Sequence, residues 1–239
     1  MNLASGTRIL KVCGCVLAAI VVSLCAVVLA TNDVHAAPTQ IVALTFDDGP
    51  DPANTPRILR ILGYHGVQAT FFVLGQEANE YPDLVREEFQ RGHVVANHGY
   101  THRDLTTLTE EGVRRELRDT NAAITAAGVP RPSLFRPPYG RTDATVKGVA
   151  DSLGMTQTQW AVLAGDKKSP LPSPTELCDR VVGRVSSGAI VLMHDGGSIN
   201  TDDALGCIIR RLKAQGYAFG LPYPSERYSS LNRSYVEVR

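Results

Sequence analysis

Short apolar runs alternate with longer amphipathic stretches from residue 40 onward. A short continuous run of apolar residues is typical of a buried strand, whereas apolar positions three or four residues apart are typical of one face of a helix. The pattern predicts strands at residues 40–46, 68–74, 92–97, 133–136, 155–160, 189–193 and 217–221. Helices are expected at residues 55–65, 77–91, 109–127, 143–153 and 202–215, and one more begins at residue 173.

Local signals place several helix ends. Thr109 is a suitable N-cap for the helix that follows it, and Gly128 is a suitable stop at the other end of that helix. Ser173 and Glu176 have the spacing of a capping box, with a proline between them at the first helical position. Pro82 predicts a break inside its helical stretch.

The order of these elements indicates the fold class. Strands and helices alternate in about seven β/α units, which favours an α/β fold with a mostly parallel sheet and helices outside it. An open doubly wound sheet and a barrel both agree with this pattern. In either fold, ligands bind at the carboxyl ends of the strands. We therefore expect functional side chains directly after the predicted strands.

The first 36 residues have the pattern of an export segment. Two basic residues are followed by 21 uncharged residues at positions 12–32, and then by a small-residue cleavage pattern that ends at Ala36. Cleavage there would make the segment a signal peptide. If it is retained, residues 12–32 could anchor the chain, since about 20 apolar residues cross a bilayer. We favour the signal peptide, and in both cases residues 37–239 form one secreted or extracytoplasmic domain.

Composition and charge exclude some functions. The chain has 24 Lys and Arg against 24 Asp and Glu, so we expect no nucleic-acid partner. Hydrophobic residues make up 44% and charged residues 20%, which is typical of a globular protein. We expect a monomer.

Two cysteines remain after the export segment, Cys178 and Cys207. They could form one disulfide in an oxidising compartment, or they could be two small buried apolar side chains. We favour the second interpretation.

Asp47 and Asp48 directly follow the first predicted strand and precede Gly49-Pro50, a pair that predicts a turn. Adjacent side chains at the end of a strand point in different directions. One carboxylate could therefore bind a metal ion while the other faces the reaction centre. A polar turn without a catalytic role is the alternative.

His98 and His102 follow the third predicted strand. On one helical turn, a spacing of four residues would put both imidazoles on the same side, where they could bind one metal ion. With Asp48 they would form a set of two histidines and a carboxylate, which suits Zn²⁺ and also Fe²⁺, Co²⁺ or Mn²⁺. Asp47 would then be free to act as a base. Two surface histidines are the alternative.

Arg136 and His194 stand at two further strand ends. Arg136 precedes two prolines that stiffen the backbone, and it could hold a carboxylate such as Asp47 in place. His194 could act as a general acid near neutral pH. The alternatives are a proline-rich turn with an exposed arginine, and a structural histidine.

With these motifs in this order, the sequence resembles the polysaccharide deacetylases of the NodB-homology type, carbohydrate esterase family four, over about residues 40–222. Gly99 stands where the second motif usually has Ser or Thr. The resemblance implies a distorted (β/α) barrel that acts on an acetylated polysaccharide or oligosaccharide. The first, second, third and fifth family motifs correspond to residues 45–49, 98–102, 136–139 and 192–194.

The fourth motif departs from the family pattern, which is Asp-x-x-Asp-Trp preceded by a Trp. Trp160 precedes it here, and Asp166 matches the second Asp, but Leu163 replaces the first Asp and Lys167 replaces the Trp. A lysine offers a mobile cation in place of a flat apolar face. We therefore expect a more open groove that binds neutral sugars weakly and favours anionic ones.

The resemblance implies a role for each residue that matches a motif. Asp48, His98 and His102 look like the metal ligands, and Asp47 looks like the base that takes a proton from metal-bound water. Arg136 would orient Asp47.

The remaining roles concern the leaving group and the acetyl group. His194 would protonate the leaving amine, and Asp166 would hold it as imidazolium. The metal and the backbone N–H of Tyr139 would stabilise the oxyanion. Leu192 would line the pocket for the acetyl methyl, and Trp160 would help to bind the sugar.

The sequence therefore predicts a metal-dependent hydrolase that removes N- or O-acetyl groups from chitooligosaccharide, peptidoglycan or xylan, with Zn²⁺ as the favoured metal. The deacetylase domain would span residues 37–239. A non-catalytic sugar- or cell-wall-binding module that kept the metal site is the alternative. The altered fourth motif favours this alternative, whereas Asp47, Arg136 and His194 oppose it, because a binder needs neither a base nor an acid.

Overall fold

The computed structural model describes residues 40–222 of the chain. The expected export segment at residues 1–36 lies outside this range. Within the described range, no helix is long and apolar enough to cross a membrane.

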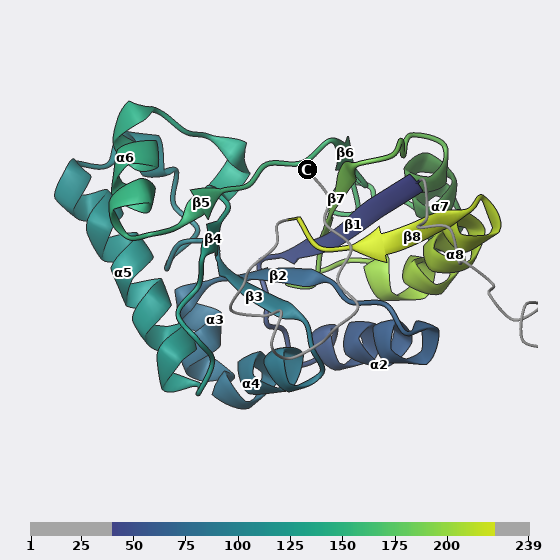
Figure 1. The fold of residues 1–239 in the computed structure, drawn as a ribbon, viewed down its shortest axis with the longest axis horizontal. Helices are drawn as coiled ribbons and strands as arrows, with labels where there is room; N and C mark the ends of the chain where they lie inside the picture. The colour runs from purple at the N-terminus through teal and green to yellow at the C-terminus, as the bar shows by residue number, and fades with distance from the viewer. Residues whose placement is uncertain (1–39, 223–239) are drawn as a thin grey trace, which may run out of the picture. The chain divides into compact units, whose positions relative to one another are not determined.

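One parallel sheet forms the centre of the fold (Figure 1). Its strand order is β5-β4-β3-β2-β1-β7-β6, and β8 also pairs with β1. The order ends at β5 and β6, so the sheet is a barrel left open between these two strands. This arrangement confirms the α/β class and the distorted (β/α) barrel. The strands are β1 (Gln40–Asp47), β2 (Thr70–Val73), β3 (Val94–Asn97), β4 (Leu134–Phe135), β5 (Thr156–Gln157), β6 (Val162–Leu163), β7 (Ala189–His194) and β8 (Tyr217–Gly220).

Strand β1 is the central strand. β7 pairs with its residues 42–47, β2 pairs with residues 45–47, and β8 pairs with residues 40–43. Because β7 takes one edge of β1, β2 and β8 share the other edge. All of these pairings are parallel, so the strands end at one side of the sheet. β1 therefore brings its carboxyl end into the middle of the other strand ends.

The helices begin where local signals predict. Ser173 forms the predicted capping box with Glu176, and Thr109 accepts a hydrogen bond from the backbone N–H of Gly112. The stretch around Pro82 divides into two helices, as predicted. The helices are α2 (Thr55–His65), α3 (Gly75–Glu80), α4 (Pro82–Gln90), α5 (Glu110–Ala126), α6 (Ala144–Ser152), α7 (Pro174–Val182) and α8 (Thr201–Ala214), with 3₁₀ turns at Leu105–Thr107 and Pro138–Gly140.

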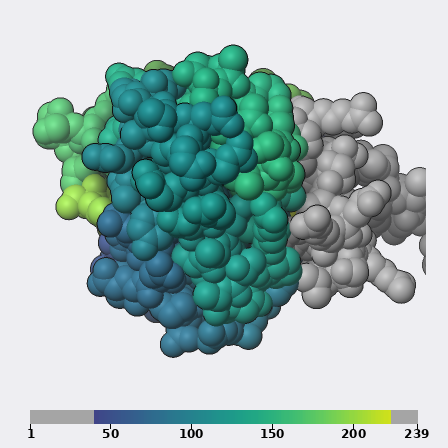
Figure 2. All heavy atoms as spheres, turned by 90° about the vertical axis from the view of Figure 1, so that its left-hand side faces the viewer, coloured from purple at the N-terminus to yellow at the C-terminus, as the bar shows by residue number. Residues whose placement is uncertain are grey.

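Apolar helix faces pack against the sheet in two main groups. Helices α2, α7 and α8 bury residues such as Leu59, Val181 and Ile208 against β1 and β7. Helices α5 and α6 form a second group that includes Leu117 and Val149, and Figure 2 looks onto this side of the molecule. Burial of each large aliphatic side chain contributes about 1.5–3 kcal/mol. Well-packed helices thus hold the carboxyl ends of the strands, where the polar residues lie, in fixed positions.

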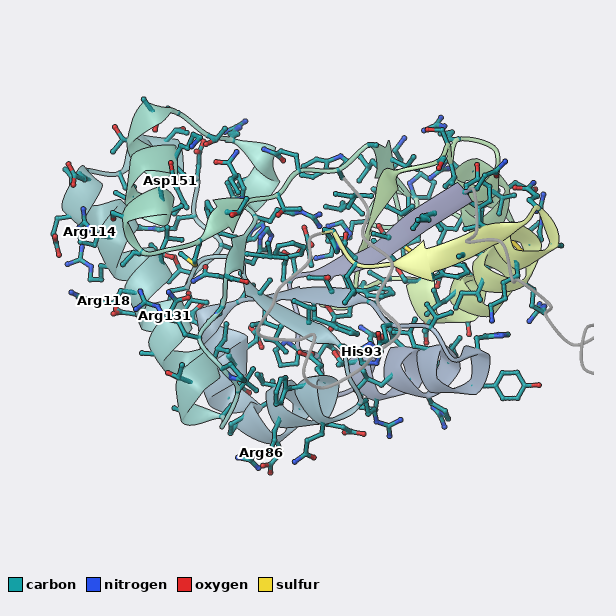
Figure 3. The ribbon with its side chains drawn as sticks, in the orientation of Figure 1. Arg86, His93, Arg114, Arg118, Arg131 and Asp151 are labelled. Atoms are coloured by element: carbon teal, nitrogen blue, oxygen red, sulfur yellow. A yellow bond between two sulfur atoms is a disulfide. The ribbon has the colours of Figure 1, made fainter. Side chains whose placement is uncertain are left out.

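Two tertiary links join neighbouring helices. Arg86 of α4 donates through Nε to the carbonyl oxygen of Ala127, directly after α5 (Figure 3). Cys178 of α7 and Cys207 of α8 form a disulfide with their Cα atoms 6.0 Å apart. The expectation of two unpaired thiols was therefore wrong, because the packing of α7 on α8 brings the two cysteines together across 29 residues of sequence.

Candidate active site

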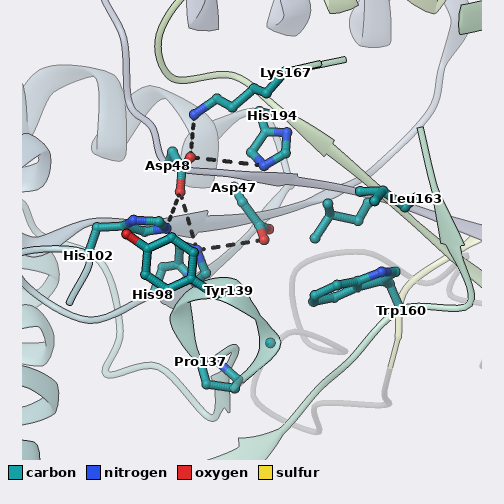
Figure 4. A pocket seen from close by; sticks show the side chains of 12 residues that line it. Asp47, Asp48, His98, His102, Pro137, Tyr139, Trp160, Leu163, Lys167 and His194 are labelled. Atoms are coloured by element: carbon teal, nitrogen blue, oxygen red, sulfur yellow. Dashed lines mark hydrogen bonds and ion pairs between the residues drawn. The ribbon is translucent and has the colours of Figure 1, made fainter. Parts of the chain in front are cut away.

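Strand ends β1, β6 and β7, with the loops after β3 and β4, surround a pocket of about 380 Å³ (Figure 4). One side of the pocket carries carboxylates and imidazoles, and the other is apolar. All ten site residues expected from the sequence are at this pocket: eight line it, and the buried Arg136 and Asp166 contact Asp47 and His194 from behind. The pocket is lined by Asp47, Asp48, His98, His102, Pro137, Tyr139, Gly140, Trp160, Leu163, Lys167, Leu192 and His194.

The turn after β1 separates the two aspartates. Asp47 ends the strand, and Asp48 has a left-handed backbone with φ of 73°. Gly49 allows a close approach, because a Cβ there would lie 2.1 Å from Oδ2 of the buried Asp195. The backbone N–H of Asp195 also donates to the Asp47 carbonyl at 3.1 Å. The turn therefore holds two neighbouring carboxylates in different directions, which is the arrangement that two separate roles require.

Asp47 is paired with Arg136. Nη1 of Arg136 donates to Oδ1 of Asp47 at 2.7 Å, and both side chains are buried. The same Nη1 donates to Thr45 Oγ1 at 2.8 Å. The guanidinium therefore compensates the buried charge of Asp47 and fixes the direction of its carboxylate, while Asp47 Oδ2 lies on the side of His98.

Arg136 is itself held from several sides. Its Nε and Nη2 donate to the carbonyl oxygens of Thr158 and Gln159, each at 3.2 Å, and its guanidinium lies 4.0 Å from the ring centroid of Phe72. Burial lowers the pKa of Arg136, and the charge of Asp47 opposes that shift. An arginine nevertheless stays protonated in proteins. The sequence alternative of an exposed arginine in a proline-rich turn does not describe this side chain, which is fully buried.

His98 and His102 reach the pocket from a loop, not from a helical turn. Gly99 and His102 have left-handed backbones with φ of 79° and 57°, which a right-handed helix excludes. The helical arrangement expected from their spacing was therefore wrong. The two imidazoles nevertheless lie together, with ring centroids 5.3 Å apart.

Glu116 of α5 holds this loop. Its Oε2 accepts hydrogen bonds from the backbone N–H groups of Tyr100 and Thr101 at 2.8 and 2.9 Å, and its Oε1 accepts one from the Thr101 hydroxyl at 2.8 Å. Sequence reasoning missed Glu116. Its helix carries several acidic residues, and the sequence offers no signal that this one faces the loop.

Three candidate metal ligands converge on one point. Oδ1 of Asp48 lies 3.3 Å from Nε2 of His98 and 3.2 Å from Nε2 of His102. The three ligand atoms all lie within 4.8 Å of one another. No other group of three ligand-type residues in this arrangement occurs within residues 40–222.

The chemistry of these atoms fits a cation. Nδ1 of His98 lies 2.7 Å from the Arg136 carbonyl, which can only accept, so Nδ1 carries the proton and Nε2 presents a lone pair. Oδ1 of Asp48 is buried and accepts no hydrogen bond from the described residues. The lone pair on Nε2 of His98 and the carboxylate oxygen Oδ1 of Asp48 face each other without a proton between them, and a positive ion would stabilise this arrangement. A donor set of two nitrogens and one oxygen suits Zn²⁺ and related divalent ions.

His194 is oriented by a buried carboxylate. Oδ1 of Asp166 lies 2.9 Å from Nδ1 of His194, and Oδ2 accepts hydrogen bonds from the His194 backbone N–H at 2.7 Å and the Thr201 hydroxyl at 2.5 Å. These contacts leave His194 Nε2 on the side of the pocket, 4.0 Å from Asp48 Oδ2.

The charges around His194 favour its protonated form. Burial alone would lower the pKa of His194, but the hydrogen bond and charge of Asp166, with the charges of Asp47 and Asp48, raise it above its ordinary value. Burial alone would raise the pKa of Asp166, but its hydrogen bonds with His194 and Thr201 hold it below its ordinary value. Both shifts favour an imidazolium that donates from Nδ1 to the Asp166 carboxylate.

The apolar side of the pocket contains the expected substrate-binding residues. Leu192 is buried and lines the pocket, and Trp160 lines it as well. Tyr139 is 61% exposed, has a left-handed backbone with φ of 60°, and places its ring edge-on to His102 at 4.5 Å between centroids. Leu163 is exposed at the pocket, where an acidic side chain would stand in the family motif.

Lys167 lines the pocket, but it is not a mobile cation. Its Nζ contacts Oδ2 of Asp48, 119 residues away in sequence. The expectation of a mobile cation was therefore wrong, because the ammonium is paired with Asp48. Weak binding of neutral sugars and a preference for anionic glycans stay predictions.

A model of the family described as "Polysaccharide deacetylase" matches residues 35–158. A chitooligosaccharide deacetylase of Rhizobium leguminosarum bv. trifolii is 41% identical over 155 residues, 65% of this chain and 71% of that protein. A peptidoglycan-N-acetylglucosamine deacetylase of Listeria monocytogenes is 38% identical over 178 residues, 74% of this chain. The matched part covers 37% of the Listeria protein's length.

Among solved structures, a family 4 carbohydrate esterase from Streptomyces lividans in complex with acetate is similar to this fold. The sequences are 38% identical, and the TM-score is 0.72 over 77% of this chain and 93% of the other.

Proposed function

The chain belongs to the polysaccharide deacetylase family, and from this premise we propose that it is a metal-dependent hydrolase that removes acetyl groups from a polysaccharide or oligosaccharide. The observation that carries the proposal is the meeting of three groups in one pocket. These are the Asp47–Arg136 pair, the imidazoles beside Asp48, and the His194–Asp166 pair. A binding module needs only the second of them.

Asp48, His98 and His102 would hold the metal, most favourably Zn²⁺. A divalent ion bound there would supply Lewis acidity toward an acetyl carbonyl and toward water. Asp47 is free of the ligand set, since its Oδ1 is bound by Arg136. Its Oδ2 is therefore the atom that accepts the proton of the attacking water.

His194 supplies the proton that the leaving group requires. Its Nδ1 is committed to Asp166, so Nε2 donates to the departing amine nitrogen, or to the oxygen of an O-acetyl ester. The hydrogen bond and charge of Asp166 raise the pKa of His194 above its ordinary value, which favours the protonated donor. The backbone N–H of Tyr139, beside the ligand His102, would stabilise the oxyanion. Leu192 and Trp160 would receive the acetyl methyl and the sugar face.

A test of the proposal is acetate release by chelator-stripped protein, with and without one equivalent of Zn²⁺. The substrates would be acetylated chitooligosaccharide, peptidoglycan and acetyl-xylan, which also decides the substrate class. We expect release only with metal. Release at the same rate by metal-free protein would contradict the metal dependence.

A non-catalytic sugar-binding role is the second candidate, and Leu163 and Lys167 favour it because both replace residues of the family motif. The pairing of Asp166 with His194 opposes it, because a binding module needs no oriented general acid. Glycan binding without acetate release from any substrate of the panel, at full metal occupancy, would favour the binding module.

We also propose that the domain at residues 37–239 is exported, as a secreted protein or through an N-terminal anchor. The disulfide between Cys178 and Cys207 supports an oxidising compartment. N-terminal sequencing of protein recovered outside the cytoplasm would test this. A new N-terminus after Ala36 is the expected result, and an intact Met1 in a membrane fraction would identify an anchor.

A further inference from the structure

The loop between β6 and α7 brings one positive charge onto the candidate metal site. Lys167 lies in this loop, its side chain is 35% exposed, and its Nζ contacts Oδ2 of Asp48 (Figure 4). The loop after β7 packs alongside, since a Cβ at Gly197 would lie 3.7 Å from Lys167 Nζ. The ammonium therefore lies between Asp48 and the loop after β7.

The two oxygens of Asp48 have different surroundings. Oδ1 faces Nε2 of His98 and Nε2 of His102, at 3.3 and 3.2 Å. Oδ2 faces Lys167 and, at 4.0 Å, Nε2 of His194. A divalent ion on Oδ1 and the ammonium on Oδ2 would thus share a single negative charge.

The nearby charges are already balanced without a bound ion. Arg136 compensates Asp47, and Lys167 compensates Asp48. Like charges repel with an energy that falls only as the inverse of distance, and partial burial weakens the screening by water. A divalent ion is attracted less strongly to a neutralised pair of carboxylates than to a pair with one charge uncompensated.

We propose that Lys167 weakens the affinity of the Asp48–His98–His102 site for divalent ions, by competing for the charge of Asp48. The inference rests on the metal site of the proposed function. Lys167 is a positioning residue in this role, because it acts through Asp48. The alternative, in which Lys167 organises Asp48 and so strengthens metal binding, predicts the opposite sign.

The experiment is a Zn²⁺ titration of metal-free protein by calorimetry, with a competing chelator for tight binding. Lys167→Met removes the charge and keeps the length of the side chain. Lys168→Met is the matched control, because it makes the same change in net charge one residue away, where no contact with Asp48 is present among the described residues. We expect Lys167→Met to bind Zn²⁺ at least about tenfold more tightly than the wild type, and Lys168→Met to stay within about twofold.

Thermal unfolding supplies a second measurement on the same proteins. Metal-free Lys167→Met should unfold at a lower temperature than the metal-free wild type, because Asp48 loses its ion-pair partner. Saturating Zn²⁺ should raise its Tm by more than it raises that of the wild type, as tighter binding requires.

Each outcome of the titration is decisive. Equal or weaker Zn²⁺ binding by Lys167→Met overturns the proposal, as does an equal gain in Lys168→Met. Absence of binding in both the wild type and Lys167→Met overturns it together with the metal assignment. The expected affinities in a protein that releases no acetate would contradict the proposed function and leave this inference standing.

Discussion

Replacement of Arg136 by methionine would remove the buried partner of Asp47. The methionine keeps much of the apolar stem that packs beside Phe72, but it loses the four hydrogen bonds that the guanidinium donates. Asp47 would then be left as a buried carboxylate without its cation. Removing one partner of a buried ion pair lowers the free energy of unfolding by about 3–5 kcal/mol. We place Arg136→Met at about 4 kcal/mol of lost unfolding free energy, because both partners are almost completely buried.

The assay is urea unfolding at pH 7, with Asp47→Asn and the double variant as companions. If the cost comes from an unpaired charge, removing both charges costs less than the sum of the single changes, by about 2 kcal/mol or more. Acetate release should fall in Arg136→Met even at temperatures where the protein is fully folded. A loss below about 1 kcal/mol for Arg136→Met, or strict additivity in the double variant, would refute the reasoning.

Two further predictions concern stability and metal binding. Burial, with a smaller contribution from the charge of Arg91, lowers the pKa of His93 to about 4, so the unfolded chain binds a proton that the folded protein does not between pH 6.5 and 4. Relative to His93→Asn, the wild type should lose about 3 kcal/mol of stability as the pH falls through this window, from 1.36 kcal/mol per pKa unit, and parallel pH profiles would contradict this. Glu116→Gln should weaken Zn²⁺ binding about tenfold by releasing the loop that carries His102, with the exposed Glu111→Gln as control. Equal affinities in the two variants would show that the loop needs no such support.

The parts of the fold that the sequence predicted well depend on local signals. The start of α7 follows from Ser173 and the proline after it, and the break at Pro82 follows from the missing N–H of that proline. The short strand β6 was missed, because it follows β5 after only four residues and the sequence pattern predicted a single strand over residues 155–160. All strands of a parallel sheet have their carboxyl ends on the same side. The polar residues that follow four of the predicted strands were therefore expected to lie close together.

Contacts between distant segments were harder to predict. The spacing of His98 and His102 suggested a helix. Left-handed backbones at Gly99 and His102 form a loop instead, and this loop also brings the two imidazoles together. The pairing of Lys167 with Asp48 depends on the path of the loop after β6, which no periodicity in the sequence describes. The same holds for the disulfide, which depends on how α7 packs on α8.

The assignment of separate roles to Asp47 and Asp48 is the central claim, and acetate release by Asp47→Asn tests it most directly. The rate would be measured at saturating Zn²⁺, with metal content checked in the same sample. We predict one bound metal per chain and a rate that falls by about 10²–10⁴-fold, the usual loss when a general base is removed. Acetate release at the wild-type rate with metal bound would contradict the account, and loss of the metal would show that the two aspartates have exchanged roles.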